Sequence, residues 1–424
     1  MNRSTSKIGM LLVPLFLLAL LSACGGNPGT KVTVHPQNYA GFPQEPVAVA
    51  YQVADGDWQW LQPDKDGAYS FYVPSGKKRY GVAVKCGGFF GLASFGNGVV
   101  LQLTTEESTE PAAACASFGP FVEAKGHYDV SGVTGAAQTV IYGDIGEFDD
   151  TSTHGDYNDL DLAYGPARDL LVLATDASDH ALAGKVYRNL DASKPFTKDV
   201  TLTNADAPTG TRSVSDFTVP SGWSGSYGVN LLSAGGALTT DKELGKGSQA
   251  GGSYEVLPGL TADDLYLVSA DAQSGDHGVM QLHLLSGSAL ADVSPSLMDP
   301  WPGGYSVTAS ALPTFALNHP DAGVQLYQVY TTTPMQLWSY TVSKGWLAGA
   351  ASYTLPDLTG VRGFEGSKGL SGEKMWWTIL AVKGNLDVGD YVGAPQAMMF
   401  FYNLPRRAGA VINAAGEEGN FTIP

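Results

Sequence analysis

Basic residues are scarce in this sequence: 24 Lys and Arg stand against 41 Asp and Glu, so the formal net charge is −17. A surface of that sign repels the phosphates of nucleic acids and of anionic lipid headgroups, which argues against a nucleic-acid partner. Charged residues of both signs make up only 15% of the chain. The composition suits divalent cations or a basic partner, and simple solvation of the surface explains it equally well.

The usual signatures of hydrolases and nucleotide-binding enzymes are also missing. The sequence contains no Gly-x-Ser-x-Gly elbow, no His-Glu-x-x-His pair and no Gly-x-x-x-x-Gly-Lys phosphate loop. Its seven histidines never stand at metal-ligand spacing. Since catalytic triads are defined by geometry and not by order along the chain, an enzyme is disfavoured without being excluded. We therefore predict no catalytic residue.

Glycine and proline are abundant, with 53 and 24 residues. This composition favours short strands joined by turns over long helices, and the chain is too long for one core of ordinary size. The run Gly132-Val-Thr-Gly135 after an expected strand is similar to the openings of carboxypeptidase-regulatory-like and other immunoglobulin-like modules. We predict an all-β protein of tandem immunoglobulin-like β-sandwich domains. Their expected ranges are 41–120, 121–206, 207–298 and 299–424.

The N-terminus has the pattern of a secretory signal. Arg3 and Lys7 precede an apolar run from Ile8 to Leu21, which is shorter than the roughly 20 residues of a membrane-spanning helix. The run ends in Leu21-Ser-Ala-Cys24, which resembles the lipobox at which bacterial lipoproteins are cleaved and lipidated. A plain signal peptide or an anchor helix is the alternative.

The lipobox resemblance implies that residues 1–23 are removed and that Cys24 carries the lipid that binds the bilayer. Gly25 stands where many inner-membrane lipoproteins have Asp, so by the same resemblance the anchor lies in the outer membrane or at the cell surface. Residues 25–40 show no periodic apolar pattern. With Cys24 they are predicted to form a flexible tether over 24–40.

With Cys24 assigned to the lipid, Cys86 and Cys115 are the remaining pair. Bulky residues alternate with small ones from Tyr80 to Cys86, which places Cys86 on the buried face of a strand. Export permits oxidation, so we predict a disulfide within the first sandwich. Two buried free thiols are the alternative.

One short motif occurs twice in the sequence. Phe71-Tyr-Val-Pro-Ser-Gly76, followed by Tyr80-Gly-Val, recurs as Phe217-Thr-Val-Pro-Ser-Gly222, followed by Tyr227-Gly-Val. An internal duplication explains the recurrence. Coincidence is the other explanation, because any tight turn after a strand favours Pro-Ser-Gly.

Acidic and amide side chains gather between residues 147 and 161. Oxygen ligands at such close spacing in a Gly-containing loop suit calcium, although the pattern is not an EF-hand. The segment resembles the acidic loop ending in Gly-Asp-Tyr-Asn-Asp-Leu of secreted bacterial β-domains such as the LruC domains, which implies calcium binding. The candidate ligands are Glu147, Asp149, Asp150, Asp156, Asn158, Asp159 and Asp161. A solvated turn is the alternative.

Trp58 and Trp60 lie two residues apart and therefore on one face of an expected strand. They form a candidate sugar-stacking patch, with a core strand as the alternative. From all these features we predict a lipid-anchored envelope protein that serves as a structural or accessory subunit of a surface or outer-membrane assembly, with other envelope proteins as partners. A glycan-binding or small-molecule-binding lipoprotein is the second hypothesis, and an extracytoplasmic enzyme is the third.

Overall fold

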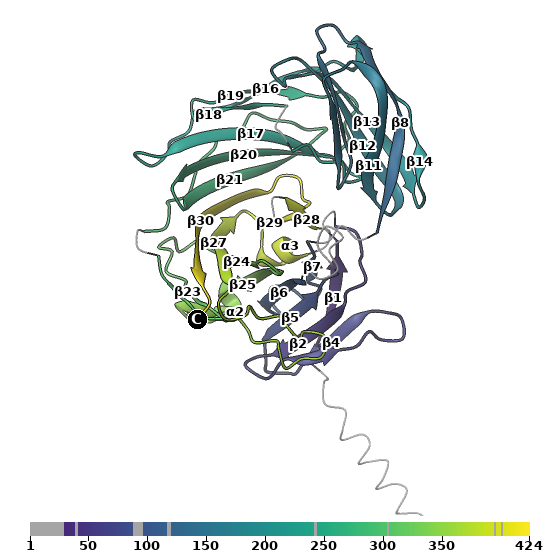
Figure 1. Cartoon of the computed structure of the whole chain (residues 1–424). Helices are drawn as coiled ribbons and strands as arrows, with labels where there is room; N and C mark the ends of the chain where they lie inside the picture. The colour runs from purple at the N-terminus through teal and green to yellow at the C-terminus, as the bar shows by residue number, and fades with distance from the viewer. Residues whose placement is uncertain are drawn as a thin grey trace, which may run out of the picture.

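The computed structural model describes residues 29–38, 41–87, 96–116, 120–240, 244–302, 305–393, 396–399 and 402–424. The predicted signal peptide and Cys24 lie outside these residues. The described part is built almost entirely of strands, which confirms the predicted all-β fold (Figure 1). No helix in these ranges is long and apolar enough to cross a membrane.

A 12-stranded sheet forms the centre of the molecule, and it bends around the short helix α3 (Val388–Val392) (Figure 1). All neighbours in this central sheet are antiparallel except β25 and β6. In order across the sheet, the strands are β18 (Lys246–Ser248), β17 (Ser224–Leu232), β20 (Leu265–Ser274), β21 (His277–Ser286), β30 (Val411–Thr422), β27 (Lys374–Gly384), β24 (Leu326–Thr333), β25 (Gln336–Ser343), β6 (Gly96–Thr104), β5 (Arg79–Lys85), β2 (Ala48–Val53) and β3 (Gln59–Leu61). Three of the four predicted segments thus contribute strands to one sheet.

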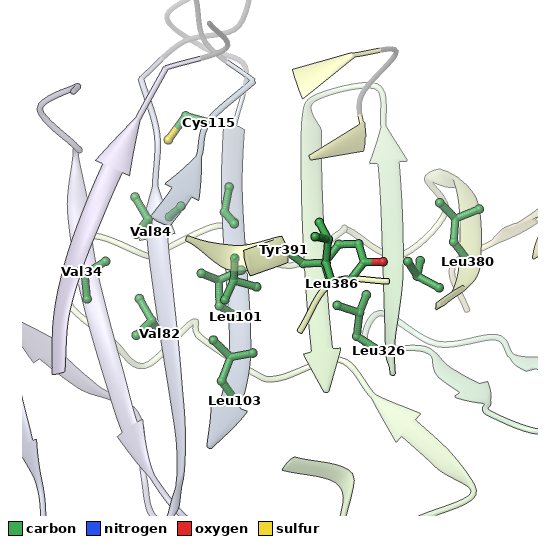
Figure 2. Packing of buried hydrophobic residues seen from close by; sticks show 14 of the residues in the cluster. Val34, Val82, Val84, Leu101, Leu103, Cys115, Leu326, Leu380, Leu386 and Tyr391 are labelled. Carbon is green, nitrogen blue, oxygen red and sulfur yellow. The ribbon is translucent and has the colours of Figure 1, made fainter. Parts of the chain in front are cut away.

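The face of this sheet toward α3, here called the inner face, is covered by N-terminal strands and by α3 itself. A small sheet packs there, made of β4 (Tyr69–Val73), β1 (Thr30–Gln37) and β7 (Ala112–Ala114). Figure 2 shows Val34 of β1 beside Val82 and Leu101, and Tyr391 of α3 near Leu326. The short hairpin of β28 (Gln396–Met399) and β29 (Tyr402–Pro405) lies on the same side (Figure 1).

The N-terminal segment corrects one prediction. Residues 30–37 were expected to belong to a flexible tether, but they form β1, which pairs with β4 antiparallel and with β7 parallel. Val32 and Val34 alternate with polar residues and are buried. This alternation spans only two apolar residues, which is too short to stand out in the sequence without its partner strands.

The opposite, outer face of the central sheet carries most of the buried aromatic residues of the last segment. Its cover consists of the loops around α2 (Lys344–Leu347) and a small sheet of β22 (Val307–Thr308), β23 (Thr314–Ala316) and β26 (Ser352–Thr354). Trp301 and Trp338 are buried there, and Trp301 Nε1 donates a hydrogen bond of 2.9 Å to the carbonyl of Ala415. Most large aromatic side chains of this segment are therefore core residues, whereas Trp376 is exposed.

Residues 121–206 form a β-sandwich with a core of its own. One sheet contains β10 (Glu147–Asp150), β9 (Gln138–Tyr142), β12 (Gly165–Thr175) and β13 (Ala181–Ala192). The other contains β11 (His154–Ala163), β8 (Phe121–Gly132), β14 (Phe196–Thr197) and β15 (Val200–Thr203), followed by the 3-10 helix η1 (Asn204–Asp206). Leu170 and Val172 of β12 point into this core, whereas Leu171 and Leu173 contact the core formed by β17, β20, β16 (Gly210–Val214) and β19 (Gly252–Val256). Strand β12 therefore packs on both of its faces.

The repeated motif marks two equivalent turns. In each, the amide after the glycine donates to the carbonyl of the proline, from Lys77 to Pro74 and from Trp223 to Pro220. Gly76 has φ +83°, and Gly222 has φ +84°. These angles favour glycine, because a Cβ makes the left-handed region costly. The turns lead into β5 and β17 of the central sheet.

Cys86 and Cys115 form the predicted disulfide, and both are buried. Replacing both with alanine removes a link across 29 residues, and we expect the domain to lose about 3.5 kcal/mol of stability. Guanidinium denaturation of the double variant and the wild type measures the loss. Reduction of the wild type should shift its unfolding midpoint toward that of the variant, and an unchanged midpoint would contradict this prediction.

Candidate functional site

The predicted calcium loop is not a single loop in the structure. Glu147, Asp149 and Asp150 lie on β10, which pairs with β9, whereas Asp156 to Asp161 lie on β11, which pairs with β8 in the facing sheet. The segment was expected to wrap one ion. Buried Tyr157 and Leu160 instead draw its second half into a strand of the sandwich core. Among the described residues, no three His, Cys, Asp or Glu side chains are grouped to hold a metal ion.

The carboxylates of β10 and the start of β11 have separate partners. Thr240 Oγ1 donates to Glu147 Oε2 over 2.7 Å, and the Tyr128 hydroxyl donates to Asp150. Asp156 lies 3.2 Å from the ring nitrogen Nδ1 of His127. These contacts hold the side chains at different places on the sandwich surface.

In the second half of the 147–161 segment, acidic side chains remain close to one another. Asp159 has φ +60° at a β-bulge between Tyr157 and Leu160, and Asn158 shares the bulge. Partial burial raises the pKa of Asp161 above its usual range, and the nearby charges of Glu123 and Asp159 raise it further. A bound cation would relieve this repulsion, and calcium stays a prediction for this segment.

Trp58 and Trp60 share a face of the sheet edge, as their spacing predicts. Both pack, half-buried, against the outer core. The Trp58 ring lies over Gly81, and the Arg362 guanidinium lies 4.2 Å from the centre of the Trp60 ring. Much of the two rings is thus used for packing, and sugar stacking stays a prediction.

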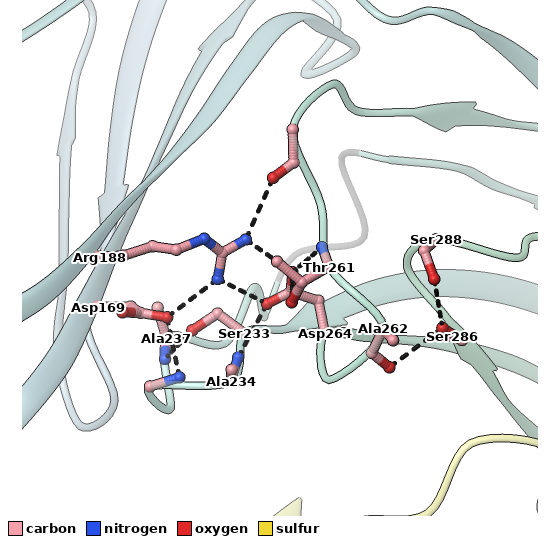
Figure 3. A network of polar contacts seen from close by, with 12 residues as sticks. Asp169, Arg188, Ser233, Ala234, Ala237, Thr261, Ala262, Asp264, Ser286 and Ser288 are labelled. Atoms are coloured by element: carbon pink, nitrogen blue, oxygen red, sulfur yellow. Dashed lines mark hydrogen bonds and ion pairs between the residues drawn. The ribbon is translucent and has the colours of Figure 1, made fainter.

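A buried group of charged residues lies where the 121–206 sandwich meets the central sheet (Figure 3). Arg188 of β13 binds both carboxylate oxygens of Asp264, at 3.0 and 2.7 Å, and lies 3.5 Å from Asp169. Backbone amides of Ala234 and Thr261 donate to the same Asp264 side chain. Burial raises the pKa of Asp264, but the hydrogen bonds from Arg188 and these amides outweigh it, so the pKa lies below its usual range.

Asp169 and Arg406 add further contacts to this group of charged residues, here called the junction network. Asp169 accepts hydrogen bonds from the amides of Gly235, at 2.8 Å, and Asn189, at 3.1 Å. Arg406 donates to the carbonyls of Ser233 and Ala234, at 2.6 and 3.1 Å. The loop after β17 is therefore held both by the sandwich and by the segment before β30.

A second ion pair lies beside the same loop. Arg168 Nε is 3.5 Å from Asp144 Oδ2, and its guanidinium stacks on Phe42 and donates to three carbonyls. Burial raises the pKa of Asp144 to about 6, although the Ala163 amide and Arg168 act in the opposite direction. Sequence reasoning missed these residues, because they are scattered singly between residues 144 and 406 and form no motif.

The inner face of the central sheet also contains a hollow of about 210 Å³ where β20, β21, β30 and β27 lie side by side. Its wall contains Asp271, Met280, Leu380 and Glu418. None of these residues belongs to a sequence motif, so no local pattern indicates this hollow.

Comparison with known proteins gives no family for this chain. No family model matches it, and no curated protein matches it. Among solved structures, it is similar to the Bacillus anthracis TIE protein, with 10% identity, a TM-score of 0.16, and 63% of this chain and 50% of that chain covered. It is also similar to a streptococcal ancillary pilin, with 7% identity, a TM-score of 0.14, and 63% of this chain and 98% of that chain covered. The chain thus spans half the length of the first protein.

The junction network yields a prediction of stability. Replacing Asp264 with alanine leaves Arg188 and two backbone amides without their shared acceptor. We expect a loss of about 3 kcal/mol, because removing one partner of a buried ion pair leaves the other uncompensated. Chemical denaturation measures it. Neighbouring Asp263 is exposed, so Asp263→Asn serves as the control and should stay within about 0.5 kcal/mol of the wild type. Equal effects of the two variants would show that the network adds no stability.

Asp144 yields a prediction of pH dependence. Its pKa is near 3.8 when unfolded and about 6 when folded, so the folded state holds the proton more tightly. The contribution of this group to stability is therefore complete below about pH 4 and falls as the pH rises through 6. Asp144→Asn resembles the protonated form, and its stability relative to the wild type should rise by about 2.5 kcal/mol from pH 4 to 7.

Denaturation curves at several pH values test this expectation. Asp66→Asn, at an exposed turn residue, is the matched control, and its difference from the wild type should stay constant over the same range. A constant difference for Asp144→Asn as well would mean that the pKa of Asp144 is the same in the folded and unfolded protein, which would contradict this prediction.

Proposed function

We propose that the mature chain is a lipid-anchored protein of the outer membrane or cell surface and that it serves as a structural or accessory subunit of an envelope assembly. The lipobox-like Leu21-Ser-Ala-Cys24 supports the anchor. The disulfide between Cys86 and Cys115 supports export, because such bonds persist in oxidising compartments.

The observation that carries the subunit role is the rigid connection between the two parts of the fold. Strand β12 has cores on both faces, and Arg188 binds Asp264 across the same junction. Apolar packing resists separation, while the bidentate ion pair fixes the orientation of the parts. A protein built this way presents its surfaces at constant positions, which suits a subunit that others assemble on.

The anchor is tested with Cys24→Ala in the native bacterium. We expect a fatty-acid label fed to the cells to be recovered on the wild type and not on the variant, since loss of the thiol removes the acyl chains that give membrane affinity. Ser22→Ala keeps the cysteine and a small residue, and it should behave as the wild type. Fatty-acid labelling of Cys24→Ala equal to that of the wild type would contradict the lipid anchor.

The subunit role is tested by cross-linking intact cells and quantifying the proteins joined to the wild type by mass spectrometry. We expect at least one envelope protein in a constant ratio to this chain, and less of it with Cys24→Ala. Recovery of the wild type alone, at several cross-linker lengths, would contradict the subunit role.

A further inference from the structure

The hollow on the inner face results from two glycines that face each other. Gly278 of β21 and Gly416 of β30 are register partners in neighbouring strands. Neither glycine places a side chain on the inner face, and Met280 and Leu380 beside them project from the same face, with Leu380 Cδ2 reaching over Gly416. An added Cβ at Gly278 would find its nearest heavy atom at 4.0 Å, so the space above this glycine is open.

The wall of the hollow combines aliphatic and acidic groups. Asp271 is the register partner of Met280, and Glu418 follows Gly416 by two residues, so both carboxylates lie on the inner face. Ser226 Oγ donates to Asp271 Oδ2 over 2.9 Å, which orients this carboxylate. Among the residues that line the hollow there is no Lys or Arg, and its histidine, His277, is paired with Glu417 at 2.7 Å.

This arrangement suits a cation on an aliphatic stem. The stem contacts Met280 and Leu380, and the charged end reaches a carboxylate at one end of the hollow, either Asp271 beside Met280 or Glu418 beyond Gly416. The volume of about 210 Å³ is below the roughly 300 to 1,000 Å³ of ordinary small-molecule sites. It fits one side chain better than a whole metabolite.

We infer that the hollow receives a lysine or arginine side chain from a partner protein of the envelope. This inference rests on the proposed function, since it names the chemistry of one contact in the assembly. The net charge of −17 favours a basic partner in the same sense, because complementary charge speeds and orients association.

The test is a titration of the lipidated protein in detergent, observed through ¹³C-methyl signals of its methionines. The probe is acetyl-lysine methylamide, and acetyl-norleucine methylamide is the control that keeps the stem and lacks the charge. We expect the lysine probe to shift the Met280 signal saturably and to leave Met298, which lies in the outer core, unchanged. The norleucine compound should bind about tenfold more weakly or not at all.

Two variants separate charge from shape. Asp271→Asn combined with Glu418→Gln keeps the hollow and should weaken the lysine probe about tenfold. Gly278→Leu fills the hollow without an immediate clash and should abolish binding. Equal binding of both probes, or full affinity in the neutralised variant, would overturn the inference. A free diamine such as putrescine binding about tenfold more tightly than the lysine probe would overturn the partner as the source of the cation.

Cross-linking in cells then separates this inference from the proposed function. Loss of the stoichiometric partner with Gly278→Leu, but not with Gly360→Ala at an exposed turn outside the hollow, supports the inference. A partner that persists with Gly278→Leu overturns the inference and leaves the proposed function intact. A wild type without any stoichiometric partner overturns the proposed function itself.

Discussion

The structure depends on a sheet that is apolar on both faces. Along β24, Leu326 points to the inner core and Tyr327 to the outer core, and Leu380 and Ile379 of the neighbouring β27 alternate in the same way. A sheet of this kind cannot face water on either side, so other parts of the chain must cover both faces. The N-terminal strands and α3 cover one face, and the loops around β23 and β26, together with the 121–206 sandwich, cover the other.

Apolar covering alone does not set the angle between the sandwich and the sheet. Charged groups at the junction do this, because a guanidinium bound by two carboxylate oxygens accepts only a narrow range of geometries. The net stability that such a buried pair adds is small, because the cost of removing both charges from water offsets most of their attraction. Its more dependable contribution is to fix the relative orientation of the segments that it joins. In this protein Arg188 and Arg406 hold loops from three distant parts of the chain in one place.

Local patterns explain which predictions the structure confirms. The all-β class follows from turn residues and from alternation within single strands, and the Cys86–Cys115 pair follows from scarcity of cysteine and one buried strand position. Local patterns led to wrong predictions where contacts with distant parts of the chain determine the structure of a segment. The two valines of β1 were too few to indicate a strand before β4 and β7 supplied hydrogen bonds, and residues 147–161 were interpreted as a loop although Tyr157 and Leu160 place half of them in a strand.

The sequence by itself determined the strand-rich class, the positions of the tight turns, the disulfide pair and the expected lipid anchor, because each of these depends on residues close together in the chain or on cysteine alone. Tertiary structure decided which strands share a sheet, that β6 pairs in parallel with β25, and that Gly278 meets Gly416 to form a hollow between carboxylates. These features join residues up to more than 200 positions apart. Many alternative pairings satisfy the same local alternation, so only the packing of the whole chain selects among them.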